Sequence, residues 1–238
     1  MLLRFRLSWI IIPLLLIDAG CSKQPSLPSG PPEGWQAADG RWWRGGVDTT
    51  VAFRPLESLG AMELETRSLA AATPSGARGE VLVEAVRRGL TPLFRVQPEV
   101  IDSLFRRYVA PKVARATLTG DLEATIDRLR EESYRNLLQY FREPRPITRL
   151  GEDVPLTYPD SLVKKGITGR VEMQVYLNAE GEPQAIWKLE GVHPVLDLLA
   201  MEATTRMRWQ PAYVRQGNTW ITVPSWIRFN IHYQIQDE

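Results

Sequence analysis

The side chains of this 238-residue chain that are best suited to chemistry are few and scattered. Its two histidines, His193 and His232, lie far apart, and neither an HExxH pattern nor a second cysteine accompanies them. Metal sites usually draw their ligands from such clusters, so no metal site is predicted. No glycine-rich phosphate loop or Gly-x-Ser-x-Gly sequence occurs either. The sequence therefore predicts a protein that is not an enzyme and needs no cofactor.

The single cysteine, Cys21, follows a segment with the features of an export signal. Arg4 and Arg6 precede an apolar run from Leu7 to Ile17. This run is shorter than the roughly 20 residues that a helix needs to cross a bilayer. Residues 1–20 are therefore predicted to be a signal peptide.

The residues around Cys21 resemble a bacterial lipobox, since two small residues, Ala19 and Gly20, come directly before the cysteine. The resemblance implies that Cys21 is lipidated and anchors the protein in the cell envelope, facing the periplasm. Serine rather than aspartate follows the cysteine, which favours the outer membrane over the inner membrane. Residues 21–34 are rich in proline, serine and glycine and are predicted to be the lipidated tether.

Charge gives no reason to expect a nucleic-acid partner. The predicted signal peptide holds two of the 29 basic and one of the 28 acidic residues, so 27 of each remain. Binding to nucleic acid depends on basic groups that neutralise phosphates, and a balanced chain offers no excess of them.

The clearest structural pattern lies after Pro155. Apolar and polar residues alternate from Arg170 to Leu177 and again from Ile227 to Ile235. Such alternation is typical of antiparallel strands with one buried face. A third strand is predicted from Gln184 to Glu190, after a turn at Asn178–Gly181.

Two helices are predicted to accompany these strands. Pro159 suits the first position of a short helix that ends before Gly166. A longer helix starts near Pro194 and ends before Pro211, with apolar residues on one stripe. The stripe consists of Leu196, Leu199, Ala200, Ala203 and Met207.

This region resembles the C-terminal domain of TonB, the energy transducer that engages outer-membrane receptors. The motifs that carry the resemblance are Tyr158-Pro159, Gly166-Ile167-Thr168-Gly169, Asn178-Ala179-Glu180-Gly181-Glu182, Arg208-Trp209-Gln210-Pro211 and the aromatic-rich final strand. Residues 155–238 are thus identified as a TonB C-terminal-like domain. The resemblance implies a two-layer fold, with a three-stranded antiparallel sheet and two helices, whose last strand lies at the sheet edge.

The resemblance also implies a binding mode, in which the last strand pairs with a short receptor segment. Strand addition of this kind uses main-chain hydrogen bonds. The residues expected to bind the partner are Tyr158, Pro159, Trp226, Arg228, Asn230 and His232. Two alternatives remain open. The polar side of the strand can be a solvated face that Pro224 and Arg228 protect from aggregation, or the strand can pair with its copy in a homodimer.

The middle of the chain resembles no known family. Residues 35–143 are predicted to be a mainly helical domain, joined to the last domain by a hinge at 144–154. Three tryptophans surround Asp39-Gly40, which is typical of a small hairpin. These tryptophans, Trp35, Trp42 and Trp43, are expected to cover the core of the helical domain, with a sugar-binding platform as the alternative.

Two amphipathic helices are predicted within the middle domain. The first is broken near Pro111; the second has Thr119 or Asp121 as its cap and carries a Glu131–Arg135 ion pair. The apolar stripes are Val100, Ile101, Leu104, Phe105 and Tyr108 in the first, and Leu122, Ile126, Leu129, Tyr134, Leu137 and Phe141 in the second. We expect them to form the domain core. A partner-binding face is the alternative, and a hydrolase site would require a deep polar pocket here.

The sequence as a whole predicts an α+β protein whose C-terminal two-layer domain follows a mainly helical domain. We expect a lipid-anchored adaptor of TonB-dependent transport, which adds a segment of an outer-membrane receptor or other envelope protein to its last strand. The alternative is a scaffolding lipoprotein of the envelope that self-associates through the same strand.

Overall fold

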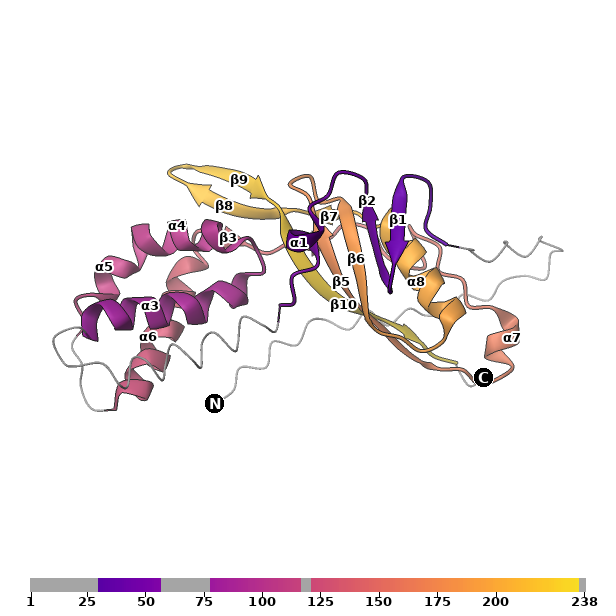
Figure 1. The fold of residues 1–238 in the computed structure, drawn as a ribbon, viewed down its shortest axis with the longest axis horizontal. Helices are drawn as coiled ribbons and strands as arrows, with labels where there is room; N and C mark the ends of the chain where they lie inside the picture. Colours follow the sequence, from indigo (N-terminus) through magenta and orange to yellow (C-terminus); the bar gives the residue numbers. More distant parts are fainter. Residues whose placement is uncertain (1–29, 57–77, 117–120, 236–238) are drawn as a thin grey trace.

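The computed structural model describes residues 30–56, 78–116 and 121–235, and it combines helices and strands as predicted. A group of helices lies at one end of the elongated molecule and a β-sheet at the other (Figure 1). Each end has its own hydrophobic core. Cys21, the predicted signal peptide and most of the predicted tether lie outside the described residues.

The helical end forms because apolar residues recur on one side of each main helix. Its elements are α3 (Arg78–Leu90), the 3-10 helix η2 (Thr91–Phe94), α4 (Pro98–Tyr108), α5 (Ala110–Val113) and α6 (Leu122–Leu137). The Asp121 carboxylate caps α6 by accepting a hydrogen bond from the N–H of Glu123 at 3.1 Å. Pro111 lies in the first turn of α5, which begins shortly after α4 ends. All residues of the predicted stripes are buried in this core or packed against it.

The sheet end contains the predicted three strands and two helices. They are β5 (Gly169–Leu177), β6 (Pro183–Glu190), β10 (Ser225–Tyr233), α7 (Asp160–Val163) and α8 (Pro194–Arg206). Both β6 and β10 run antiparallel to β5, which lies between them. The predicted stripe of α8 is buried against one face of this sheet. In the β5–β6 turn, Gly181 has a φ of 81°, and a Cβ there would lie 1.8 Å from the Trp209 carbonyl oxygen.

The predicted hairpin exists, but it belongs to this sheet and not to the helical domain. It consists of β1 (Trp35–Ala38) and β2 (Arg41–Arg44), with Asp39 and Gly40 both at positive φ in the turn. Strand β2 pairs with β6, which extends the sheet to five strands in the order β1-β2-β6-β5-β10. Trp42 is buried in the sheet core. The helix α1 (Thr49–Ala52) then crosses the opposite face, where Phe53 packs against Trp43 and Trp187.

A second hairpin, which the sequence analysis missed, carries C-terminal residues into the helical core. It consists of β8 (Ala212–Gln216) and β9 (Thr219–Val223), and it pairs with β3 (Phe141–Arg142). Phe141 was expected in a helix, but α6 ends at Leu137 and Phe141 starts this strand instead. The expected hinge is also packed, because β4 (Arg145–Pro146) pairs with β7 (Trp209–Gln210), and Leu150 and Val154 are buried.

The two cores therefore draw on interleaved parts of the sequence. The first hairpin and the final strand belong to the sheet end, while the second hairpin belongs to the helical end. Within the three described ranges, none of the helices has both the length and the apolar character of a membrane span.

Candidate functional site

Strand β10 lies at one end of the five-stranded sheet, as predicted for the last strand. It pairs with β5 along its whole length, from Ser225 opposite Leu177 to Tyr233 opposite Gly169. Among the described residues, β5 is the only strand beside it in the sheet. The strand thus presents a long edge, whereas the hairpin β1–β2 covers the opposite edge of the three predicted strands.

The direction of each main-chain group along β10 follows from its pairing. Alternate residues of an antiparallel strand turn their N–H and C=O groups toward the neighbouring strand and away from it. The N–H of Trp226 points away from β5, since it donates to the Arg95 carbonyl oxygen at 2.8 Å. Every second residue shares this direction, so the main-chain groups of Arg228, Asn230 and His232 also face outward.

Trp226 itself is already engaged. Its side chain is 2% exposed, and the indole N–H donates to the Ala52 carbonyl oxygen at 3.0 Å. Its ring lies 5.1 Å from that of Tyr176, and its outward N–H is bonded to Arg95. Of the predicted partner-binding residues, Trp226 therefore anchors the start of the strand, and the edge open to an added strand begins after it.

Charged residues form a network on the sheet face that does not carry α8. Glu172 of β5 pairs with Arg228 of β10 and, at 3.7 Å, with Arg170. Arg170 also pairs with Glu190 of β6 at 2.8 Å. This hydrogen bond to Glu190 is the main reason that the pKa of Arg170 is raised. The network holds two positive and two negative side chains, so it orients Arg228 without giving the edge a strong net charge.

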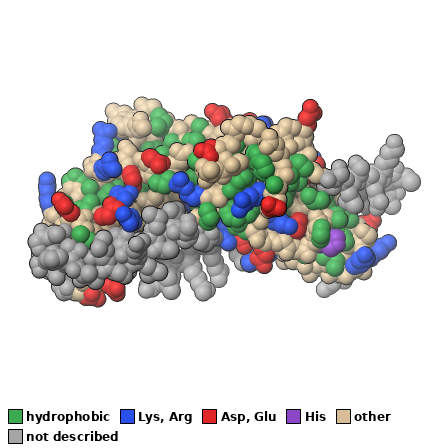
Figure 2. All heavy atoms as spheres, in the orientation of Figure 1, with side chains coloured by type: hydrophobic (Ala, Val, Ile, Leu, Met, Phe, Trp, Pro, Cys, Tyr) green, Lys and Arg blue, Asp and Glu red, His purple; other side chains and the backbone are tan. Residues whose placement is uncertain are grey.

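Asn230 and His232 complete the outward-facing set. Asn230 is exposed and lies opposite Glu172 in the pairing with β5. His232 is half-buried and lies opposite Arg170. In the face of the molecule shown in Figure 2, basic and acidic side chains lie among hydrophobic ones over the sheet. A partner on this edge would meet mixed polar side chains and an ordered main chain.

Tyr158 meets the other end of β10, and Pro159 follows it in the chain. The Tyr158 ring packs edge-on against Tyr233, with centroids 5.3 Å apart, and its hydroxyl donates to the Ile167 carbonyl oxygen. The Tyr233 hydroxyl donates to the Leu196 carbonyl oxygen at 3.1 Å, and burial is the main cause of its raised pKa. Pro159 is the N-cap of α7. The structure thus brings the Tyr158 segment to the strand, where it fixes the last residue of β10.

The other histidine has a structural position. His193 is the N-cap of α8, and its Nδ1 accepts a hydrogen bond from the N–H of Val195 at 3.2 Å. Nearby, the buried Asp197 accepts from the Lys188 ammonium at 2.7 Å and from the Val192 N–H at 2.9 Å. In the part of the chain that the structure describes, no group of three or more His, Cys, Asp and Glu side chains is placed to hold a metal ion.

One segment of the edge was not predicted from the sequence. Val96 forms an isolated antiparallel bridge with Ser225, so the chain between η2 and α4 occupies the first position outside β10. Arg95, next to it, has a φ of 48°, which non-glycine residues adopt rarely. Nothing in the local pattern of residues 95–97 indicates a strand, because the bridge depends on a contact with residues far along the chain.

The C-terminal part of the chain is similar to known proteins. Residues 154–235 match the family model described as the Gram-negative bacterial TonB protein C-terminal. No curated protein matches the chain. The solution NMR structure of the Pseudomonas aeruginosa TonB C-terminal domain is similar to it at 22% identity, over 40% of this chain and 90% of that chain, with a TM-score of 0.32.

Proposed function

Because residues 154–235 form a domain of the TonB C-terminal family, we propose that this protein is a TonB-like adaptor of transport across the outer membrane. It binds an extended segment of an outer-membrane receptor, which adds to the sheet beside β10. The protein acts by binding and by transmitting force or position, not by catalysis. The family model covers about a third of the chain and does not include the helices between residues 78 and 137. A role of the helical end in this function is therefore also a proposal.

The position of β10 at the end of the sheet carries this proposal. An added strand forms main-chain hydrogen bonds with outward-facing N–H and C=O groups, and the strand already fixes these groups by pairing with β5. The outer strand at the other end of the sheet, β1, has only 4 residues against 9 in β10, which favours the same choice of side. Arg228, Asn230 and His232 contribute selectivity through their side chains, while Tyr158 holds the end of the strand in place through its contact with Tyr233.

We also propose that a lipid on Cys21 anchors the protein to the outer membrane, facing the periplasm. The segment from Ser22 to Gly34 would extend at most roughly 40 Å. That reach keeps the fold close to the membrane in which the receptors lie. Mass spectrometry of the mature N-terminus, together with membrane fractionation, tests the anchor separately from the binding site.

A proline substitution at Asn230 tests the strand addition directly. The N–H of Asn230 faces away from β5, so Asn230→Pro removes an outward donor and leaves the ladder to β5 intact, as proline at a sheet edge allows. Asn230→Ala is the matched control, because it removes the side chain and keeps the donor. Binding to the periplasmic segments of receptors from the same bacterium is expected to be lost in Asn230→Pro and to be weakened in Asn230→Ala only by the contribution of the side chain.

The same pair of variants separates receptor binding from self-association. A tight dimer of the wild-type protein that dissociates in Asn230→Pro would favour the scaffolding alternative. If receptor segments bind Asn230→Pro as tightly as wild type while its circular dichroism is unchanged, strand addition at β10 is wrong.

A further inference from the structure

The helical end limits how far a partner strand can extend along β10. The Val96–Ser225 bridge and the hydrogen bond from the Trp226 N–H to the Arg95 carbonyl oxygen place the segment Arg95–Gln97 on the outer edge of the strand. A partner strand that pairs with the rest of β10 meets this segment at Trp226. Its chain then has to leave the edge.

A groove begins beside this point. It lies between α4 and the hairpin β8–β9 and has a volume of about 510 Å³. Its near end contains Val223, two positions before Ser225, and Glu99, three positions after Val96. Because α4 and the hairpin both run away from the bridge, the groove continues outward from the start of β10.

Apart from Glu99, Ser103 and Gln216, the lining of the groove changes from apolar to basic along its length. The floor is formed by the apolar and aromatic side chains of Val100, Leu104, Tyr108, Val214, Ile221 and Val223. Arg107 and Arg215 lie at the far end. The Arg107 guanidinium sits 5.4 Å from the Tyr108 ring centroid, and Arg215 donates to the Gly217 carbonyl oxygen at 3.1 Å. Neither contact neutralises the positive charge.

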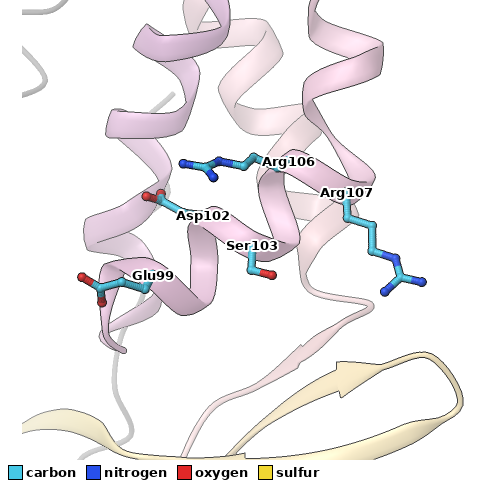
Figure 3. Close-up of a pocket in the computed structure, with 5 residues that line it drawn as sticks. All are labelled: Glu99, Asp102, Ser103, Arg106 and Arg107. Atoms are coloured by element: carbon cyan, nitrogen blue, oxygen red, sulfur yellow. The ribbon is translucent and has the colours of Figure 1, made fainter.

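The opposite flank of α4 is less suited to a ligand. Figure 3 shows Ser103 and Arg107 projecting toward the hairpin, while Asp102 and Arg106 project to the other side of the helix. The Asp102 carboxylate is held by Arg87, with both oxygens 2.7 Å from the same guanidinium nitrogen. The hollow that Asp102 and Arg106 help to line therefore includes a carboxylate that is committed to an internal ion pair, whereas the far end of the groove on the hairpin side carries two arginines and no acidic residue.

We propose that this groove binds the continuation of the partner chain that pairs with β10, and that this continuation is apolar with acidic residues at its far end. The inference rests on the proposed strand addition. Glu99 to Arg107 spans about 12 Å along a helix, so an extended continuation needs about four residues. Continuity with the β10 edge favours a peptide, and the two arginines favour carboxylates at its end.

Three synthetic peptides test the groove. The first is a labelled seven-residue strand of alternating valine and threonine, and the other two add Leu-Leu-Asp-Glu at its C-terminus or Glu-Asp-Leu-Leu at its N-terminus. A strand antiparallel to β10 reaches the groove with its C-terminal extension, and a parallel strand with its N-terminal one. We expect one extension to tighten binding about tenfold. The gain should disappear in Arg107→Glu/Arg215→Glu and persist in Lys112→Glu/Arg115→Glu, which changes the same charge outside the groove.

Equal affinity of all three peptides, or a gain that survives in Arg107→Glu/Arg215→Glu, would overturn the groove. If Asn230→Pro, in which the groove is intact, binds none of the three peptides, this result tests strand addition alone. If the seven-residue strand fails to bind, strand addition fails, and the free Leu-Leu-Asp-Glu peptide then decides the groove by NMR. Shifts confined to the methyls of Val100, Leu104 and Ile221 would support it. Peptide-induced shifts at other residues would overturn the assignment to a peptide. So would shifts of these three methyls that appear with dodecyl phosphate, used as a lipid-like anion, and not with the peptide.

Discussion

The indole N–H of Trp226 donates a hydrogen bond to the carbonyl oxygen of Ala52 at 3.0 Å, across 174 residues of sequence. This bond ties the start of β10 to α1, which follows the first hairpin. Both residues are 2% exposed, so the bond is shielded from bulk solvent. The start of the candidate edge is thus fixed from the N-terminal part of the chain.

Replacing Trp226 by phenylalanine should destabilise the protein even though a ring remains. The change leaves the Ala52 carbonyl oxygen buried without this donor, which costs about 1–3 kcal/mol. Trp220→Phe is the matched control, because Trp220 is half-exposed near the hairpin tip and packs under Arg142. Urea unfolding of both variants measures the difference, and equal losses would contradict a specific role for the Trp226 bond.

The first hairpin should be part of the stability of the C-terminal sheet. Trp42 is 4% exposed in the sheet core, so Trp42→Ala should lower the free energy of unfolding by about 3–5 kcal/mol. Amide exchange in β6 should accelerate with it, because β6 pairs with β2. Trp35→Ala, at a half-buried position of β1, should cost less. Unchanged β6 exchange in Trp42→Ala would show that the hairpin is only loosely attached.

Gly181 should tolerate no side chain. An added Cβ would clash with the main chain of Trp209, and the φ of 81° is unfavourable for any other residue. Gly181→Ala is therefore expected to cost about 2 kcal/mol or more. Gly217→Ala is the control, since its φ is also positive but its Cβ would meet open space. Thermal unfolding compares the two, and a similar small loss would mean that the turn can move away from Trp209.

The helical end should lose stability in acid through Glu84. Hydrogen bonds to Arg87 are the main cause that lowers the pKa of Glu84 from 4.5 to about 2. Because the pKa is lowered in the folded state, the ionised Glu84 carboxylate contributes its full stabilisation above pH 4.5, and this stabilisation is lost as the pH falls toward 2. Because the Glu84 side chain is 38% exposed, screening by solvent makes this stabilisation smaller. Unfolding between pH 5 and 2 should depend less on pH in Glu84→Gln than in wild type or Glu80→Gln, and identical pH profiles would contradict this role.

Local pattern was enough to predict the elements whose burial is periodic. Apolar and polar residues alternate along β10 because α8 packs on one face of the sheet. The apolar stripe of α8 can be recognised in the sequence because it packs against that face. The Asp39-Gly40 turn was recognisable because Asp-Gly is a residue pair that suits a turn with positive φ at both positions, which the structure shows. In each case the signal lies within a few neighbouring residues.

Pairings between distant segments could not be predicted in this way. No feature of Trp42 indicates whether it packs on the helices or on β6, because either core would bury it. The hairpin β8–β9 was missed because its short strands precede a long one with a stronger pattern. The edge was foreseen, but the Val96 bridge that limits it depends on a contact across more than half of the chain.

Amide hydrogen exchange at Asn230, with and without a bound receptor segment, tests strand addition most directly. The N–H of Phe229 faces β5 and serves as an internal reference, because it is already paired in the free protein. We predict that binding slows exchange at Asn230 by at least about tenfold and leaves Phe229 nearly unchanged. A receptor segment that binds while exchange at Asn230 stays the same would contradict the account.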